Sequence, residues 1–159
     1  MSQRTKGLDP IIFDNTEILI IGTFPGEKSR DENQYYYDSR NQFWNIMSDV
    51  LNTDFLNLEY KNRINILQEH KIGLWDVIES CEIEGSLDKN IKEPEYNDFS
   101  HLTQVKKIIC NGKAAEENYN KNDKIVNNVE VLRVPSSSSA NNGSTGRSEQ
   151  WKKAITGQL

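Results

Sequence analysis

Two polar segments of the chain hold most of the side chains that could bind a ligand or take part in a reaction. The first contains the strings G-T-F-P-G-E-K-S, residues 22–29, and Q-Y-Y-Y-D-S-R-N-Q-F-W, residues 34–44. Gly22 would let the backbone turn sharply and approach a ligand, and Pro25-Gly26 predicts a tight turn. Neither glycine signature of nucleotide-binding loops is present. A ligand-binding loop and a plain surface turn are therefore equally good interpretations of residues 22–26.

The second segment, Pro135 to Gly146, consists almost entirely of serine, asparagine, glycine and threonine. This is also the composition of a flexible linker, but a predicted helix follows it directly, which argues against a linker. Long polar loops in a compact domain are usually either functional or disordered. The segment is therefore a second candidate for a binding loop.

The elements that must position these segments can be predicted from the apolar pattern. Four β-branched runs predict strands at Glu17–Ile21, Ile72–Val77, Lys106–Cys110 and Val129–Val134. Their apolarity is continuous rather than alternating, which is typical of parallel strands covered on both faces. Helical spacing is found over residues 43–51, 60–69, 112–121 and 148–155. The alternation predicts one α/β domain over residues 1–159, a three-layer α/β/α sandwich with a central, mostly parallel four-stranded sheet.

In such sheets ligands bind at the carboxyl ends of the strands. Both polar segments leave predicted strands at that edge, so we expect them to share one mouth. Two long loops on the same rim favour a functional site over disorder.

Composition narrows the function classes. The net charge of −5 argues mildly against nucleic acid, although a small enzyme needs only a local basic patch. No apolar stretch is long enough for a membrane span and the first residues lack a secretory signal, so we expect a cytoplasmic protein. Two cysteines, Cys81 and Cys110, and two unclustered histidines cannot supply a structural zinc or iron–sulfur site, so no metal or redox cofactor is expected.

Several strings are informative because of their order. A strand ending in Gly-x-x-Pro-Gly is followed by an aromatic residue and then by Asn-x-Phe-Trp. The later blocks are G-L-W-D-V-I-E-S-C (73–81), E-G-S-L-D (84–88), N-D-F (97–99), N-G-K-A-A-E (111–116) and P-S-S-S-S-A-N (135–141). From about Ile18 to Trp151 the chain thus resembles the uracil-DNA glycosylase superfamily, and most of all its hypoxanthine-DNA (deoxyinosine) glycosylase branch. Any one block is weak, whereas the ordered set is specific.

The resemblance implies a catalytic residue. Phe24 stands where mismatch-specific uracil enzymes keep a catalytic asparagine, and phenylalanine cannot orient water. In the deoxyinosine branch the role resembles that of the asparagine in Asn-x-Phe-Trp, which is Asn41. An amide oxygen can accept a hydrogen bond from the attacking water but cannot remove its proton, so catalysis would depend on positioning and leaving-group electrostatics. The alternative for Asn41 is a structural hydrogen bond that holds the loop to the following helix.

The resemblance also implies a base pocket. Its residues are Gly22, Thr23, Phe24, Tyr36 and Asp76. Tyr36 would stack on the flipped base, but packing in the loop's own core is an open alternative for all three tyrosines of the run. Asp76 stands where uracil enzymes hold an amide, and a carboxylate could accept a hydrogen bond from the N1–H of hypoxanthine or the N3–H of uracil. Its alternative is a helix N-cap, because an aspartate after a strand suits capping.

The serine-rich segment matches the loop that contacts the DNA backbone at the extruded nucleotide. Its implied contact residues are Pro135, Ser136, Ser137, Ser138, Ser139 and Asn141, whose hydroxyl and N–H groups can bind phosphates. Two departures from the family are Asp38-Ser39 in place of His-Pro and Ser139 in place of a proline. We expect Lys28, Arg40, Lys113 and Arg147 to offset the negative charge at the mouth.

The expected function is removal of deaminated bases from DNA, with hypoxanthine preferred and uracil possible. The enzyme would be a monomeric, monofunctional glycosylase associated with the nucleoid, since no lysine occupies a motif position suited to a Schiff base. Two rival functions stay open. One is a hydrolase of free nucleosides or nucleotides, which the acidic charge favours. The other is a catalytically degenerate module that binds damaged bases, which Asp38-Ser39 favours.

Overall fold

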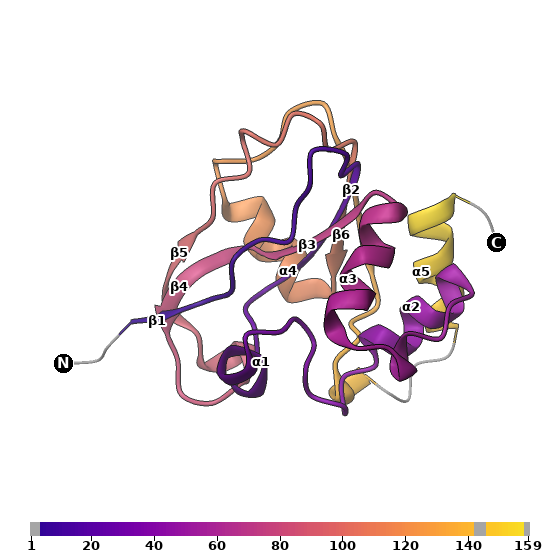
Figure 1. Cartoon of the computed structure of the whole chain (residues 1–159). Coiled ribbons are helices and arrows are strands. Elements are labelled where there is room, and N and C mark those ends of the chain that lie inside the picture. Colours follow the sequence, from indigo (N-terminus) through magenta and orange to yellow (C-terminus); the bar gives the residue numbers. More distant parts are fainter. Residues whose placement is uncertain (1–3, 142–145, 158–159) are drawn as a thin grey trace.

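The computed structural model describes residues 4–141 and 146–157. A four-stranded sheet in the order β3-β2-β6-β7 lies at its centre, and every neighbouring pair of strands is parallel (Figure 1). The strands are β2 (Ile18–Gly22), β3 (Ile72–Asp76), β6 (Lys107–Asn111) and β7 (Glu130–Val134). All four predicted strands are therefore confirmed, and the sheet is entirely parallel.

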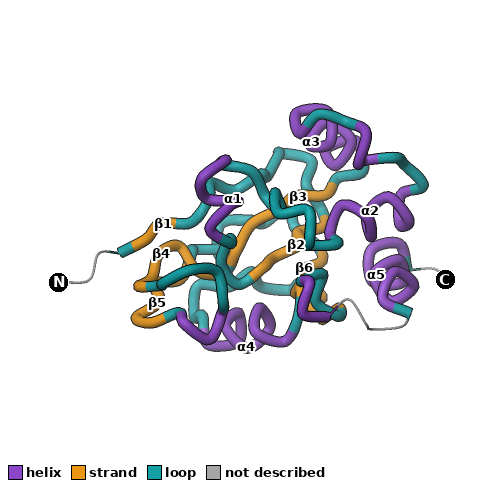
Figure 2. Tube along the Cα trace, turned by 90° about the horizontal axis from the view of Figure 1, so that it is seen from below, coloured by secondary structure: helices purple, strands orange, loops and turns teal. Residues whose placement is uncertain are grey.

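The continuous apolarity of the strands follows from cover on both faces. Ile20 of β2 packs in one core cluster with α2 (Phe43–Leu51), α3 (Tyr60–Glu69) and α5 (Arg147–Thr156). Its neighbours Leu19 and Ile21 pack in a second cluster with α4 (Lys113–Lys121) on the opposite face. Figure 2 shows α4 on one side of the sheet and α2 and α3 on the opposite side. The predicted three-layer α/β/α sandwich is confirmed.

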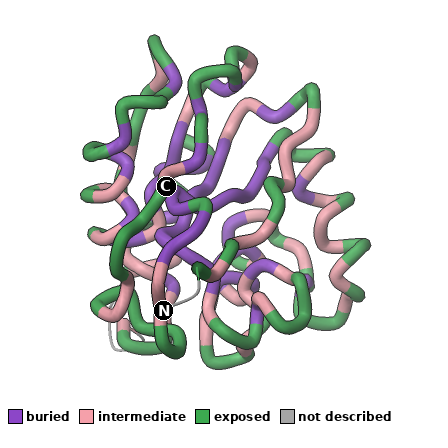
Figure 3. The backbone as a smooth tube through the Cα atoms, turned by 90° about the vertical axis from the view of Figure 1, so that its left-hand side faces the viewer, coloured by how far each residue is buried: buried purple, intermediate pink, exposed green. Residues whose placement is uncertain are grey.

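Burial follows the same plan. The central strands are the most buried part of the chain, and exposed residues gather on the helices and outer turns (Figure 3). β3 is buried at all five positions, from Ile72 to Asp76. An ionisable carboxyl group at the end of such a strand is thus carried into the protein interior.

A second, antiparallel sheet was not predicted. Its order is β1-β4-β5, with β1 (Thr5–Lys6), β4 (Ile78–Glu82) and β5 (Lys92–Tyr96). β5 reads K-E-P-E-Y, is exposed at four positions and contains Pro94, which is tolerated because β5 is an edge strand. Neither β5 nor the two-residue β1 carries an apolar pattern that sequence reasoning could detect.

Short helical turns also interrupt the segments expected to be loops. The helix α1 (Glu27–Glu32) lies within the first polar segment and ends at Asn33, whose φ is 55°. The 3-10 turns η2 (Asp88–Asn90) and η3 (Ser139–Asn141) lie in the connections after β4 and β7. In the described part of the chain no helix is long and apolar enough to cross a membrane.

Candidate active site

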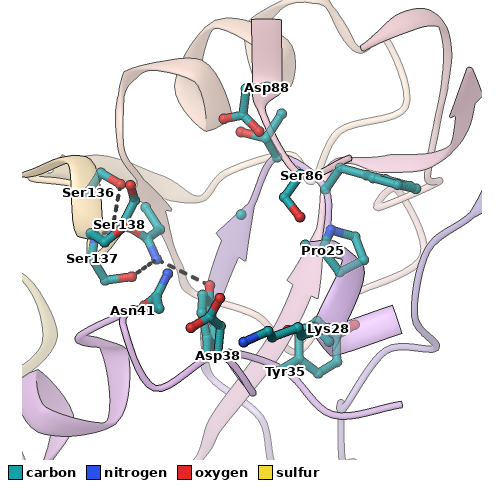
Figure 4. A pocket seen from close by; sticks show the side chains of 18 of the residues that line it. Pro25, Lys28, Tyr35, Asp38, Asn41, Ser86, Asp88, Ser136, Ser137 and Ser138 are labelled. Carbon is teal, nitrogen blue, oxygen red and sulfur yellow. Dashed lines mark hydrogen bonds between the residues drawn. The ribbon is translucent and has the colours of Figure 1, made fainter. Parts of the chain in front are cut away.

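A pocket of about 510 Å³ opens at the carboxyl edge of the parallel sheet (Figure 4). Four segments line it: residues 22–29 from the end of β2 onward, residues between Tyr35 and Asn41 before α2, residues 86–88 up to the start of η2, and residues 136–140 after β7. Asp76 and Asn111, the last residues of β3 and β6, line it as well. The two polar segments therefore share one mouth, as the sequence predicted.

Most of the predicted site residues line this pocket. These are Gly22, Thr23, Phe24, Tyr36, Asn41, Asp76, Ser136, Ser137, Ser138 and Ser139. Pro135 and Asn141 are not among the lining residues. The Pro135 carbonyl accepts a hydrogen bond from the indole N–H of Trp151, and the Asn141 amide donates one to the Ser136 carbonyl. Both residues thus hold the loop rather than face the pocket.

Asp76 is the most unusual polar group of the pocket. It is 5% exposed, and its Oδ2 atom is buried without a hydrogen-bond partner among the described residues. Its other oxygen, Oδ1, lies close to Gly22, where a Cβ atom would come within 2.6 Å of it. β2 therefore needs glycine at this position so that the carboxyl group fits against the strand.

Burial decides the protonation of Asp76. The pKa of its carboxyl group is raised to about 7, chiefly because burial disfavours the charged form and secondly because of the nearby Asp88 carboxylate. A hydrogen bond with the backbone of Gly22 acts in the opposite direction and lowers the pKa. The helix N-cap interpretation of Asp76 is wrong, because β4 follows β3 after a single residue and no helix begins there.

Asn41 makes the structural hydrogen bond that was its alternative role. Its Oδ1 accepts a hydrogen bond of 3.0 Å from the backbone N–H of Phe43 at the start of α2. No described residue accepts a hydrogen bond from its Nδ2 group. An amide oxygen has two lone pairs, so one remains for a water molecule, and the amide nitrogen adds a donor. The geometry is therefore compatible with both roles.

The three tyrosines of the run have different environments. Tyr35 is buried and its hydroxyl donates to the Asp9 carbonyl at 2.8 Å, whereas Tyr37 is 45% exposed and does not line the main pocket. Tyr36 lines the pocket, and its ring stacks on Phe43 with centroids 3.9 Å apart. A base could therefore stack only on the face of Tyr36 that Phe43 leaves free. Its backbone φ of 57° is rare for a side chain of this size and indicates a conformation imposed by its surroundings.

Asn111 joins three parts of the site, and the sequence did not single it out as a site residue. Its Nδ2 donates to the Tyr36 hydroxyl at 3.2 Å and to Ser137 Oγ at 2.9 Å, and its Oδ1 accepts from the Ser137 N–H at 2.9 Å. Its position at the end of β6, in the string C-N-G, was the available signal.

The hydroxyl of Tyr36 stays neutral in this site. Desolvation raises its pKa, and the nearby carboxyl group of Asp76 raises it further.

The serine loop, defined as residues 135–141, is firmly tied to the rest of the protein. Ser137 is fully buried, and its carbonyl accepts a hydrogen bond of 2.9 Å from the N–H of Gln42. The guanidinium group of Arg147 donates to the carbonyls of Ser136 and Asn141, both at 3.1 Å. The linker interpretation is therefore wrong for this part. Residues 142–145 of the predicted segment lie outside the described residues.

The acidic loop, defined as residues 84–88, forms a wall that the sequence did not predict. Ser86 Oγ accepts a hydrogen bond of 2.8 Å from the N–H of Glu27, and Arg30 donates to the Gly85 carbonyl at 3.2 Å. The Thr23 hydroxyl donates to the carboxylate of Asp88. The block E-G-S-L-D was visible in the sequence, but its place at the mouth depends on the unpredicted second sheet.

Charges at the mouth are partly neutralised within the protein. Arg40 forms an ion pair of 2.7 Å with Asp38, so the acidic residue that replaces the family histidine is compensated locally. This hydrogen-bonded pair holds the pKa of Asp38 well below its usual range. Lys113 lies 3.7 Å from Glu117, and Arg147 is engaged by the serine loop. Of the four expected cations, Lys28 is the one that lines the pocket and forms no ion pair with another described residue.

Phe24 contributes little polar character to the pocket. Its ring is 8% exposed and belongs to a small apolar cluster with Ile78 and Cys81. The guanidinium carbon of Arg30 lies 5.4 Å from the centre of the ring. Among the described residues, no cluster of three or more histidine, cysteine, aspartate or glutamate side chains suits a metal ion.

Comparison with known proteins places these features in a family. The model of the uracil DNA glycosylase superfamily matches residues 10–159. A protein of Methanosarcina barkeri named hypoxanthine DNA glycosylase is 39% identical over 118 residues, which cover 72% of this chain and 75% of the relative. A protein of the same name from Methanosarcina acetivorans is 34% identical over 154 residues, covering 92% of this chain and 95% of the relative.

A solved structure agrees with the fold. The solution NMR structure of a protein from Methanosarcina acetivorans, described as a candidate uracil DNA glycosylase, superposes with a TM-score of 0.85. It is 32% identical and covers 96% of this chain and 97% of its own.

Proposed function

The chain belongs to the uracil DNA glycosylase superfamily, and on that premise we propose that it removes hypoxanthine from DNA. The reaction is hydrolysis of the bond between the base and deoxyribose, without cleavage of the DNA strand. Two relatives that are 34% and 39% identical carry the name hypoxanthine DNA glycosylase, which supports this substrate over others of the superfamily.

The observation that carries the proposal is that Asp76 lines the pocket and that its buried Oδ2 atom has no hydrogen-bond partner among the described residues. An unsatisfied buried acceptor is costly, and a ligand that donates a hydrogen bond to it removes that cost. The lactam form of hypoxanthine has a donor at N1, whereas adenine has a lone pair there. When Asp76 is ionised, it therefore accepts a hydrogen bond from hypoxanthine and repels adenine.

Uracil is the second substrate on the same reasoning. Its N3–H is a donor on the Watson–Crick edge, and a pocket of about 510 Å³ admits either base. Because the pyrimidine is smaller, it fills the space between Asp76 and Tyr36 less completely. We therefore expect hypoxanthine to be the better substrate.

The remaining predicted residues serve the sugar, the water and the phosphates. Asn41 positions the attacking water with the free lone pair of its amide oxygen, and the open face of Tyr36 stacks on the base. The fixed serine loop presents hydroxyl and N–H groups to the DNA backbone at the extruded nucleotide. A monomer acting on the DNA of the nucleoid, in the cytoplasm, is part of the same proposal.

The test is base release from duplex oligonucleotides that carry one hypoxanthine, uracil or adenine in the same sequence, with chelator present. Excision that yields alkali-sensitive but otherwise intact strands, fastest for hypoxanthine, is the expected result. Asp76→Ala should lose this activity, and Asp98→Ala, an exposed aspartate outside the pocket, should keep it. Release from free deoxyinosine at an equal rate would favour the nucleoside hydrolase, and binding without release would favour a non-catalytic module.

A further inference from the structure

The predicted catalytic groups leave one demand of the reaction unmet. When the glycosidic bond breaks, its electron pair leaves with the base, which takes up a proton, and C1′ of the sugar becomes electron-deficient. Water then adds its oxygen to C1′ and releases a proton. Asn41 and the serines of the pocket are neutral, and Phe24 is apolar, so none of them balances the positive charge that develops on the sugar.

The charged residues that line the pocket are few: Glu27, Lys28, Asp38, Arg40, Asp76 and Asp88. Three of the four acidic residues are paired or lie in positions that do not suit a charge beside the sugar. Asp38 is paired with Arg40 at 2.7 Å, Glu27 lies exposed in the first turn of α1, and Asp76 lies buried at the end of β3. Glu27 and Asp88 are both exposed, and of the two it is the charge of Asp88 that acts on Asp76 inside the pocket.

The position of Asp88 suits a charge near the sugar. It is exposed whereas Asp76 is buried, so it lies nearer to the mouth of the pocket than Asp76 does. Its carboxylate accepts a hydrogen bond from Thr23, the residue after Gly22, and its charge acts on Asp76. In Figure 4 Asp88 lies at the top of the view and Asn41 at the lower left, and both residues line the pocket.

The carboxylate is also held in place before any substrate arrives. The acidic loop is tied to α1 through Ser86 and Gly85, and Asn90 Nδ2 donates to the Glu84 carbonyl at 3.3 Å on the other side of Asp88. A charge fixed in advance stabilises a transition state without reorganisation at the moment of reaction.

We propose that Asp88 faces the deoxyribose during base release and stabilises the positive charge on C1′ and the ring oxygen. The acidic loop thereby supplies the charge that Phe24 cannot supply after β2. The inference rests on the proposed glycosylase function, but it concerns the charge of the transition state rather than the choice of base.

The experiment measures binding of two duplexes that carry abasic-site analogues. One analogue is a neutral tetrahydrofuran, and the other is a pyrrolidine that is protonated where the sugar cation forms. The whole protein should bind the cationic analogue about tenfold or more tightly than the neutral one. Asp88→Asn should remove that preference, Asp88→Glu should keep part of it, and the charge-matched control Glu84→Gln should leave it unchanged, because Glu84 does not line the pocket.

The second measurement is excision of hypoxanthine under single-turnover conditions. Asp88→Asn should lower the rate by about 10²-fold with little change in duplex affinity, since it removes an interaction made in the transition state. The role of Asp88 is overturned if the unmodified protein does not prefer the cationic analogue. It is also overturned if Asp88→Asn keeps the same preference. If the unmodified protein releases no base, the proposed function is overturned instead. The binding experiment still shows in that case whether Asp88 stabilises a positive charge at the position of the sugar.

Discussion

The serine loop and the acidic loop face each other across one pocket and are built in opposite ways. The serine loop is neutral, and hydrogen bonds from Asn111, Gln42 and Arg147 fix its backbone. On the acidic side, Asp88 carries a charge at the mouth and Asp76 keeps a buried oxygen without a partner among the described residues. A fixed backbone gives the pocket its shape, whereas a buried acceptor without a partner gives selectivity, because a substrate can still donate to it.

This contrast makes different predictions for the two sides. Loss of hydrogen bonds on the serine side should disturb geometry and therefore reduce every activity together. Loss of charge on the acidic side should change the response to pH and to the choice of base. Five experiments test the contrast, from the largest expected effect to the smallest.

The largest effect is expected for Asn41→Ala, on the serine side. Excision should fall by about 10³-fold, since the water loses its positioning group, while the free energy of unfolding should fall by only about 1 kcal/mol for the lost hydrogen bond to the N–H of Phe43. Single-turnover excision and urea unfolding measure the two quantities. Loss of stability with normal excision would assign Asn41 the structural role alone.

Asn111→Ala should have the next largest effect. It removes the hydrogen bonds of Asn111 with the Tyr36 hydroxyl and with the Oγ and the N–H of Ser137. We therefore expect excision to fall by about 10²-fold and the free energy of unfolding by about 2 kcal/mol. Asn118→Ala is the control, because Asn118 also makes two side-chain hydrogen bonds but lies on α4 outside the pocket. Equal effects on hypoxanthine and uracil are expected. A change in the ratio of the excision rates of hypoxanthine and uracil would contradict the idea that the serine side affects geometry alone.

Asp76→Asn should change selectivity more than rate. Because the pKa of Asp76 is about 7, discrimination between hypoxanthine and adenine in the unmodified protein should increase by about tenfold as the pH rises from about 6 to about 8. The asparagine variant should show no such change. In Asp88→Asn the midpoint should move to lower pH, since the Asp88 charge is one cause of the raised pKa. Parallel pH profiles in the three proteins would remove Asp76 from base recognition.

The same residue predicts a stability effect of known sign. A carboxyl group whose pKa is raised in the folded state stabilises the protein at low pH, and this contribution is lost as the pH rises through about 7. The difference in the free energy of unfolding between Asp76→Asn and the unmodified protein should therefore shift in favour of the variant by on the order of 1–3 kcal/mol from pH 5 to pH 8. Urea unfolding at the two pH values measures the change.

The smallest effect is expected for Ser86→Ala. Loss of the hydrogen bond from the N–H of Glu27 should cost about 1 kcal/mol of stability and reduce excision by about threefold, because Arg30 still holds Gly85. Thermal unfolding and excision assays report both. A loss of stability and of excision as large as that of Asn111→Ala would show that the position of the acidic loop depends on this one hydrogen bond.

Sequence reasoning was accurate where a short apolar pattern determines structure. β2, β3, β6 and β7 are each runs of about five residues with both faces covered, and this pattern has few alternatives. The shared mouth followed from the parallel sheet. β5 could not be found in the same way, because an exposed edge strand that contains Pro94 needs no apolar residues.

The site was predictable in membership more than in environment. The order of motifs placed Asn41, Tyr36 and Asp76 together, and the pocket contains all three. The burial of Asp76, the contact of Tyr36 with Phe43 and the network around Asn111 depend on pairs far apart in the chain. No local pattern encodes such pairs. The N-cap interpretation of Asp76 failed for this reason, since only the tertiary fold shows that a strand follows.

The close fit of Gly22 against Asp76 has an evolutionary consequence. A methyl group at position 22 would come within 2.6 Å of the carboxylate oxygen, so the two positions cannot change independently. A relative that gains a side chain at position 22 must also lose or move the acid at position 76, and with it the acceptor that we propose to select the base. The two positions should therefore vary together among homologues, and a change of substrate in this lineage would pass through both.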